Sequence, residues 1–259
     1  MHFAKSIVPT TLLALAALFA TVGSTRLGAA DFWERIGLKK SSEGSSLLGL
    51  TEAQLTSGLK EALAKGIQSA ITNLGRADGF LGDQAVRIST PESLRKLEKG
   101  LRTLGQDQMA DDFVMAMNRA AEKAVPETAE VLGGAVRQMS IEDAKSIVNG
   151  SRTAATDFFR RTTQTNLQER LLPIVQRATE SVGVTSSYKR MTDKVGGASL
   201  TKWFGRGGGM EAFDLDAYVT RKTLDGLFLK MADEEKAIRE NPAARTTELL
   251  QKVFGGGGK

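Results

Sequence analysis

Apolar residues recur along this chain at three- and four-residue spacing, and this feature constrains it to helices more than any other. The clearest series follows Thr51 on a single helical face: Leu55, Leu59, Leu63, Ile67, Ile71 and Leu74. Thr51 and Gln54 have the spacing of a capping box, and Gly75 is typical of a helix end. We therefore predict a helix over residues 51–75.

Similar stripes and end signals predict helices along most of the remaining chain. Thr90-Pro91 starts the second, because proline favours the first helical position, and its stripe is Leu94, Leu97, Leu101 and Leu104 before Gly105. The longest helix is predicted to open at Asp214 or Asp216. The other predicted helices cover residues 109–125, 126–139, 141–149 and 153–183, a short segment around Tyr188, and a last segment beyond Asn241-Pro242 that contains Leu249 and Val253.

No segment shows the sustained alternation of a strand. Residues 84–89 can form at most one short strand, and a lone strand is not stable. Short loops favour antiparallel helical neighbours. We therefore predict an all-α fold, with a single domain of about eight or nine antiparallel helices over residues 47–255. A flexible tether over residues 31–46 precedes it and a disordered tail over residues 256–259 follows it.

The first 30 residues have the arrangement of a secretory signal peptide. Lys5 gives a basic start, an apolar run follows over residues 12–22, and small residues come after it. This run is shorter than the roughly 20 residues that span a bilayer, which argues against a transmembrane anchor. We predict cleavage after Ala30, or alternatively after Ser24, and a soluble periplasmic protein.

Composition excludes several mechanisms. The chain has no cysteine, and its one histidine, His2, would leave with the signal peptide. The mature chain therefore cannot build a Ser-His-Asp triad, a thiolate nucleophile or the usual zinc site, and we predict no cofactor and no metal. Lys5 and Arg26 precede Ala30, so 33 basic residues remain against 30 acidic ones. A charge so nearly balanced predicts no nucleic-acid partner.

Several strings along the chain resemble an uncharacterised bacterial family, namely GRADGFLGDQAVRI, IEDAKSIVNG, DLDAYVTRKTLDGLF and RENPAARTTELLQKVFG. The family is a domain of unknown function, family 4197, and the resemblance covers nearly all of residues 48–255. It implies a helical protein that is exported or lipid-anchored in Gram-negative bacteria, and it implies no catalytic residues. Because the leader here lacks a cysteine, the resemblance points to a soluble member.

Four arginines are the candidates for a ligand site: Arg76, Arg161, Arg239 and Arg245. Arg76 follows a helix-ending glycine, Arg161 follows two phenylalanines, and the other two flank a turn that leads into a helix, where free N–H groups favour an anion. Guanidinium groups suit carboxylates and phosphates. Each arginine can equally pair with a local acid, as Arg239 can with Glu235 at helical spacing.

Paired carboxylates are the enzymatic alternative, because a glycosidase needs only two acids across a cleft. Most acids on helices lie on solvated faces, and spacing alone does not show which two converge. The possible donors are Glu34, Glu92, Glu122, Glu142, Asp143, Asp157 and Glu169.

Three other motifs are weaker. The loop with Asp78 and Asp83 lacks the acid spacing of a calcium loop, so a turn is favoured. Residues 205–211 are glycine-rich but lack the ending of a phosphate-binding loop. Trp203 and Phe204 can make peripheral membrane contact, although packing in the core is the preferred interpretation.

These observations favour a non-enzymatic binding or structural module of the Gram-negative cell envelope. Its expected partner is an envelope protein or a small anionic ligand. The alternative is a carboxylate-dependent hydrolase that acts on envelope glycans.

Overall fold

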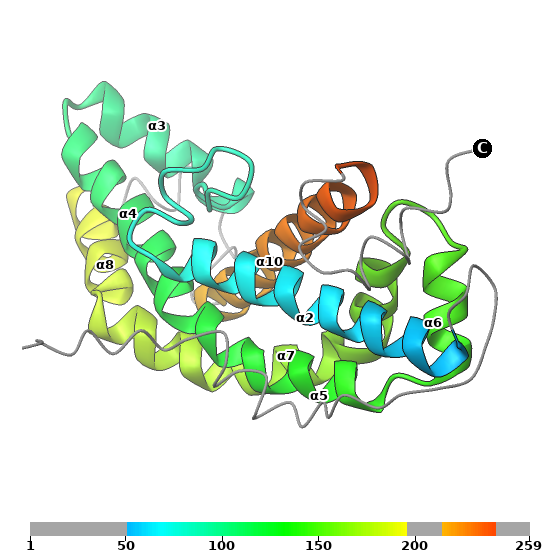
Figure 1. Cartoon of the computed structure of the whole chain (residues 1–259). Helices are drawn as coiled ribbons and strands as arrows, with labels where there is room; N and C mark the ends of the chain where they lie inside the picture. Colours follow the sequence, from blue (N-terminus) through cyan, green and yellow to red (C-terminus); the bar gives the residue numbers. More distant parts are fainter. Residues whose placement is uncertain (1–50, 196–213, 242–259) are drawn as a thin grey trace, which may run out of the picture. The chain divides into compact units, whose positions relative to one another are not determined.

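The computed structural model describes residues 51–195 and 214–241, all within one compact unit. These residues form helices without a strand, which confirms the all-α prediction (Figure 1). Two short 3-10 helices, Glu92–Leu94 and Val125–Thr128, precede α3 and α5. The α-helices are α2 (Glu52–Gly75), α3 (Arg95–Thr103), α4 (Asp107–Ala124), α5 (Ala129–Gln138), α6 (Ile141–Val148), α7 (Ala154–Ser181), α8 (Val184–Val195) and α10 (Leu215–Glu240).

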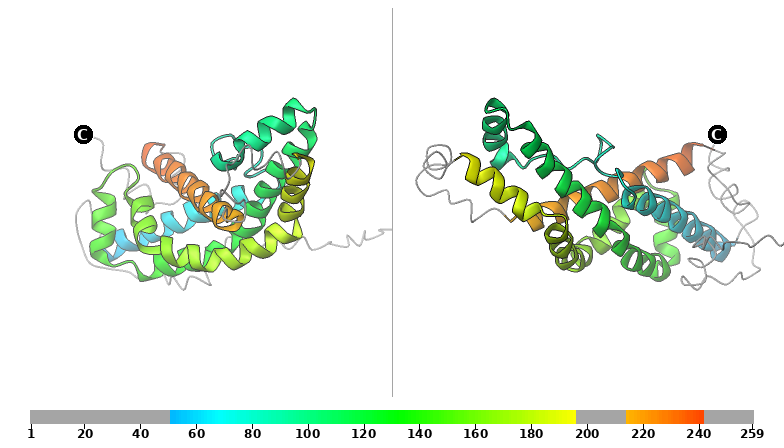
Figure 2. Two further views of the ribbon diagram at one scale, coloured as in Figure 1. Left: turned by 180° about the vertical axis from the view of Figure 1, so that it is seen from behind. Right: turned by 90° about the vertical axis from the view of Figure 1, so that its left-hand side faces the viewer.

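Helix α10 lies at the centre of this arrangement. It packs most extensively on α7 and also contacts α2 and α4 (Figures 1 and 2). Helix α8 packs on α3 and α4. Helices α4, α7 and α10 each contribute one large buried ring to the core: Phe113, Phe159 and Phe228. Helix α10 buries a stripe of apolar residues: Val219, Leu224, Leu227, Phe228, Met231 and Ile238. The core therefore lies between α10 and the helices around it.

Two details of the predicted helices are wrong. Leu104 was placed on the buried stripe of its helix, but it is 62% exposed. Helix α3 ends at Thr103 and Gly105 takes a positive φ of 69°, so Leu104 lies past the last turn and away from the stripe. Helix α10 has 26 residues and is shorter than α7, which has 28.

Several predictions concern residues outside the described ones. These are the signal peptide (1–30), the tether (31–46), Trp203 and Phe204, the last helix and the tail (256–259). Among the helices that are described, none is both long enough and apolar enough to cross a membrane.

Candidate functional site

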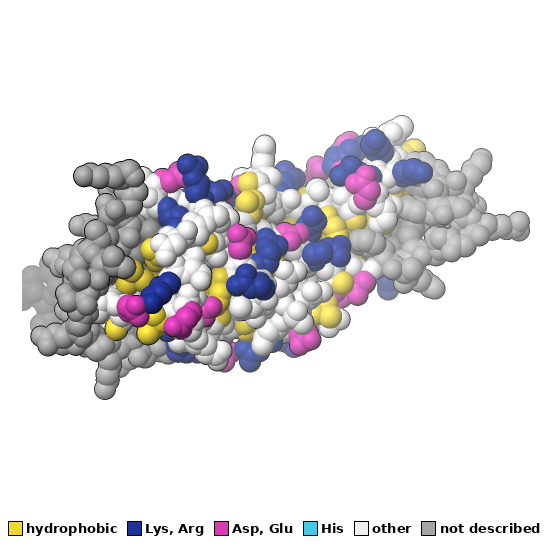
Figure 3. All heavy atoms as spheres, turned by 90° about the vertical axis from the view of Figure 1, so that its right-hand side faces the viewer, with side chains coloured by type: hydrophobic (Ala, Val, Ile, Leu, Met, Phe, Trp, Pro, Cys, Tyr) yellow, Lys and Arg dark blue, Asp and Glu magenta, His cyan; other side chains and the backbone are white. Residues whose placement is uncertain are grey.

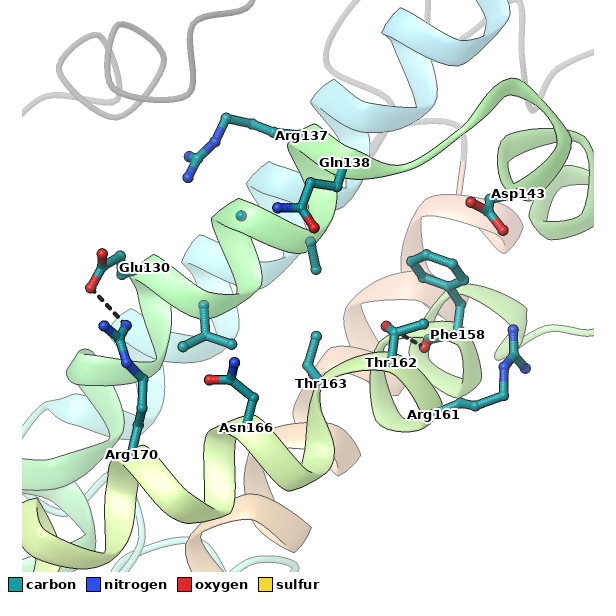
Figure 4. A pocket seen from close by; sticks show the side chains of 13 residues that line it. Glu130, Arg137, Gln138, Asp143, Phe158, Arg161, Thr162, Thr163, Asn166 and Arg170 are labelled. Atoms are coloured by element: carbon teal, nitrogen blue, oxygen red, sulfur yellow. Dashed lines mark hydrogen bonds and ion pairs between the residues drawn. The ribbon is translucent and has the colours of Figure 1, made fainter.

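A polar groove with a volume of about 760 Å³ lies between α5 and α7 (Figure 4). Each helix contributes one face, and Asp143 of α6 lies at one end. From α5 the lining residues are Glu130, Val131, Gly134, Ala135, Arg137 and Gln138. From α7 they are Phe158, Arg161, Thr162, Thr163, Asn166 and Arg170. The small residues at the middle of α5 leave the groove open there.

The two acids of this groove already have partners. Arg170 binds Glu130 at 2.8 Å near one end, in a pair that is mostly exposed. Asp143 accepts hydrogen bonds from the backbone N–H and the hydroxyl of Ser140, in the capping box of α6. These bonds, the backbone one first, lower the pKa of Asp143, and the charge of Arg161 adds to the effect. Asp143 is therefore ionised at neutral pH.

The two remaining arginines of the groove, Arg137 and Arg161, form no ion pair within the described residues. The guanidinium of Arg161 lies over the ring of Phe158, 5.9 Å from its centroid. The guanidinium of Arg137 lies beside the preceding turn of α5. Its two terminal nitrogens are 3.6 and 3.7 Å from the positions that Cβ atoms on Gly133 and Gly134 would take. Both arginines are exposed, so both are available to an anion from solvent.

Two amide side chains project into the space between the helices. Gln138 and Asn166 make no hydrogen bond to the described part of the chain, and both point into the groove (Figure 4). The hydroxyls of Thr162 and Thr163 instead donate to carbonyls of α7 itself, at 2.8 and 2.7 Å. The amides are therefore the neutral groups that can best offer both a donor and an acceptor to a ligand.

Of the four arginines predicted from the sequence, the three that the structure describes do not meet in one place. Arg161 lines the groove between α5 and α7, whereas Arg76 lines a separate groove of about 590 Å³ between the end of α2 and α10. Arg239 is largely buried, binds Glu235 at 2.9 Å and donates to backbone carbonyls at the end of α6. Arg245 lies outside the described residues. The pairing of Arg239 with Glu235 was predicted correctly, but not its burial.

The sequence did not single out Arg137 and Arg170, although both line the groove. Their positions on α5 and α7 were visible in the sequence, but the faces that these helices turn to each other were not. No larger basic patch takes over their role on the face drawn in Figure 3, where acidic and basic side chains are interspersed.

One of the predicted carboxylates, Glu122, has a structural role. Glu122 is buried and accepts hydrogen bonds from the backbone N–H groups of Phe80 and Leu81, at 3.1 and 3.2 Å. Arg119 binds it at 2.7 Å. Glu122 thus holds the loop after α2 against α4.

The second groove is rich in acids, but one of them, Asp83, has the wrong electrostatics for a general acid. The hydrogen bond from Lys230 is the main cause that lowers the pKa of Asp83, and a general acid in a glycosidase needs a raised one. The described residues also contain no group of three acidic or histidine side chains placed to hold a metal ion.

A family model described as "Protein of unknown function (DUF4197)" matches residues 49–255. No curated protein and no solved structure matches the chain. Since the family model covers most of the sequence, the chain belongs to this family.

Proposed function

We propose that this DUF4197 protein is a non-enzymatic binding module of the Gram-negative cell envelope that recognises an anionic ligand in the groove between α5 and α7. One observation carries the proposal: Arg137 and Arg161 line the same groove, and neither forms an ion pair within the described residues. A guanidinium that is not already paired can give a carboxylate or phosphate two parallel hydrogen bonds. The leader-like residues 1–30 support export to the envelope.

The rival function is a carboxylate-dependent hydrolase of envelope glycans. Its support is the number of acids on the helices and the second groove, which is lined by Asp78, Asp83, Asp233 and Glu234. Asp83 forms an ion pair with Lys230, and Glu234 accepts a hydrogen bond from the hydroxyl of Ser69 at 2.6 Å. The hydrogen bond from Lys230 lowers the pKa of Asp83, so this acid is not suited to donate a proton, and the binding module is the better proposal.

Replacing both Arg137 and Arg161 with alanine should weaken anion binding at least tenfold. Both arginines are exposed, so each charge-assisted contact contributes up to about 1 kcal/mol, and the two together exceed the roughly 1.4 kcal/mol that corresponds to a tenfold change in affinity. The probe is citrate at low ionic strength, titrated while amide NMR shifts of α5 and α7 are recorded. The matched control is Arg177→Ala, since Arg177 is an exposed arginine of α7 that does not line the groove.

The control should bind citrate like the wild type, and all three proteins should keep the same circular dichroism spectrum. Citrate shifts that are scattered over the surface, or that persist in the double variant, would contradict the proposed site. Release of reducing ends from purified envelope glycan would instead favour the hydrolase.

The proposed location has its own test. Protein recovered from the periplasm of its native cells should begin near Thr25 or Asp31, because signal peptidase removes the leader after a small residue. N-terminal sequencing measures this directly. A mature protein that still begins with Met1 would contradict export with cleavage.

A further inference from the structure

We infer that the anionic ligand is a short acidic segment of a partner protein, bound in extended conformation along the groove between α5 and α7. This inference rests on the proposed function and adds the chemical class of the ligand. It depends on the length of the groove, on its two free amides and on the distribution of its charges.

The groove is much longer than a single ion. Its lining on α7 runs from Phe158 to Arg170, which is about 18 Å at roughly 1.5 Å per residue. An extended peptide advances about 3.3 Å per residue, so about five residues fit along this length. A phosphate or a lone carboxylate would fill only a small part of the volume of about 760 Å³.

The two amides match a peptide main chain. Gln138 and Asn166 come from opposite sides of the groove and project into it (Figure 4). Each offers one carbonyl acceptor and an NH₂ donor, and each residue of an extended chain presents one N–H and one C=O. The amides can therefore bind main-chain groups, while Arg137 and Arg161 bind acidic side chains.

The charges of the groove disfavour a uniform polyanion. Glu130 lies near one end and Asp143 near the other, and both are acids (Figure 4). A polymer that carries a negative charge on every unit would meet both of them. A peptide can place one or two acidic side chains beside the arginines and neutral residues beside the acids, which lowers this repulsion. The ring of Phe158, the one aromatic side chain that lines the groove in the described residues, lies under Arg161 and is not a free platform for a sugar.

The test starts from a phage library of random heptapeptides, panned on the wild type after depletion on the Arg137→Ala/Arg161→Ala variant. We expect enrichment of sequences with one or two acidic residues within about five positions. A synthetic peptide of this kind should bind at least tenfold more tightly than citrate and should shift amide signals along both α5 and α7.

A second double variant separates main-chain recognition from anion recognition. Gln138→Ala/Asn166→Ala should weaken the peptide about tenfold and change citrate binding less than twofold, because citrate has no main chain. The matched control is Gln176→Ala, an exposed amide of α7 that lies outside the groove lining, and it should leave both affinities unchanged.

The outcomes distinguish the two proposals. If citrate binds through the arginines but no acidic peptide is enriched, or if trigalacturonate binds more tightly than any peptide, the inference fails and the proposed function stands. The inference also fails if the enriched peptides bind the Gln138→Ala/Asn166→Ala variant as tightly as the wild type. If neither citrate nor any peptide depends on Arg137 and Arg161, both proposals fail.

Discussion

Replacing Glu235 with alanine should lower the free energy of unfolding by about 3–5 kcal/mol, the range for breaking a buried ion pair from one side. The Glu235 carboxylate is 6% exposed and accepts hydrogen bonds from the backbone N–H groups of Ala155 and Thr156, at 3.0 and 2.9 Å. It also binds Arg239, whose side chain is 13% exposed. The substitution would remove the buried anion that binds Arg239 and the acceptor of two N–H groups in the first turn of α7.

Urea unfolding followed by circular dichroism measures this loss. The control is Glu240→Ala on the same helix, because Glu240 pairs with Arg152 at the surface, where both side chains are more than half exposed. Such a pair contributes less than about 1 kcal/mol. Equal losses in the two variants would show that burial of the pair has no special role in stability.

Replacing Asn118 with leucine should lower the free energy of unfolding by about 2–4 kcal/mol. The buried N–H and C=O groups of Ile88 lose their partners, at about 1–3 kcal/mol each. The Asn118 side chain is fully buried. It accepts from the N–H of Ile88 at 2.8 Å and donates to the carbonyl of Ile88 at 2.8 Å and of Val114 at 2.7 Å. Leucine has a similar volume, so the effect isolates the lost hydrogen bonds.

Hydrogen exchange of the Ile88 amide gives the sharper readout. We expect its protection to fall in Asn118→Leu, since the loop after α2 is no longer fixed to α4 at this point. The control is Asn73→Leu, at an exposed position of α2, which should change stability by at most about 0.5 kcal/mol. An Ile88 amide that stays protected in Asn118→Leu would contradict this account of the loop.

The helices could be predicted because their signals are local. The capping box of Thr51 and Gln54 lies within four residues and is formed as predicted, with bonds of 2.9 and 3.0 Å. Ser140 likewise caps α6 together with Asp143, three residues later. A cap of this kind depends only on the residues at one helix start, so the sequence contains all that is needed.

The site could not be predicted to the same extent, because it depends on which faces the helices turn to one another. Arg239 and Glu235 have the spacing of a surface pair, yet the ends of α6 and α7 enclose them. Arg137 lines the groove only because α5 packs beside α7, and nothing near it in the sequence shows that neighbour. Of the candidate residues that the sequence singled out, Arg161 and Asp143 line this groove.

The α6–α7 junction also has a consequence for biosynthesis. Glu235 and Arg239 complete this junction from 80 and 92 positions farther along the chain, counted from Ala155 and Ile147. At about 5–20 residues per second, the ribosome needs roughly 4–18 s to make that intervening length. During this time the ends of α6 and α7 have no partners, and the nascent chain cannot close its core. A chain that stays open until α10 has been synthesised suits passage through a secretion channel, which the proposed export would require.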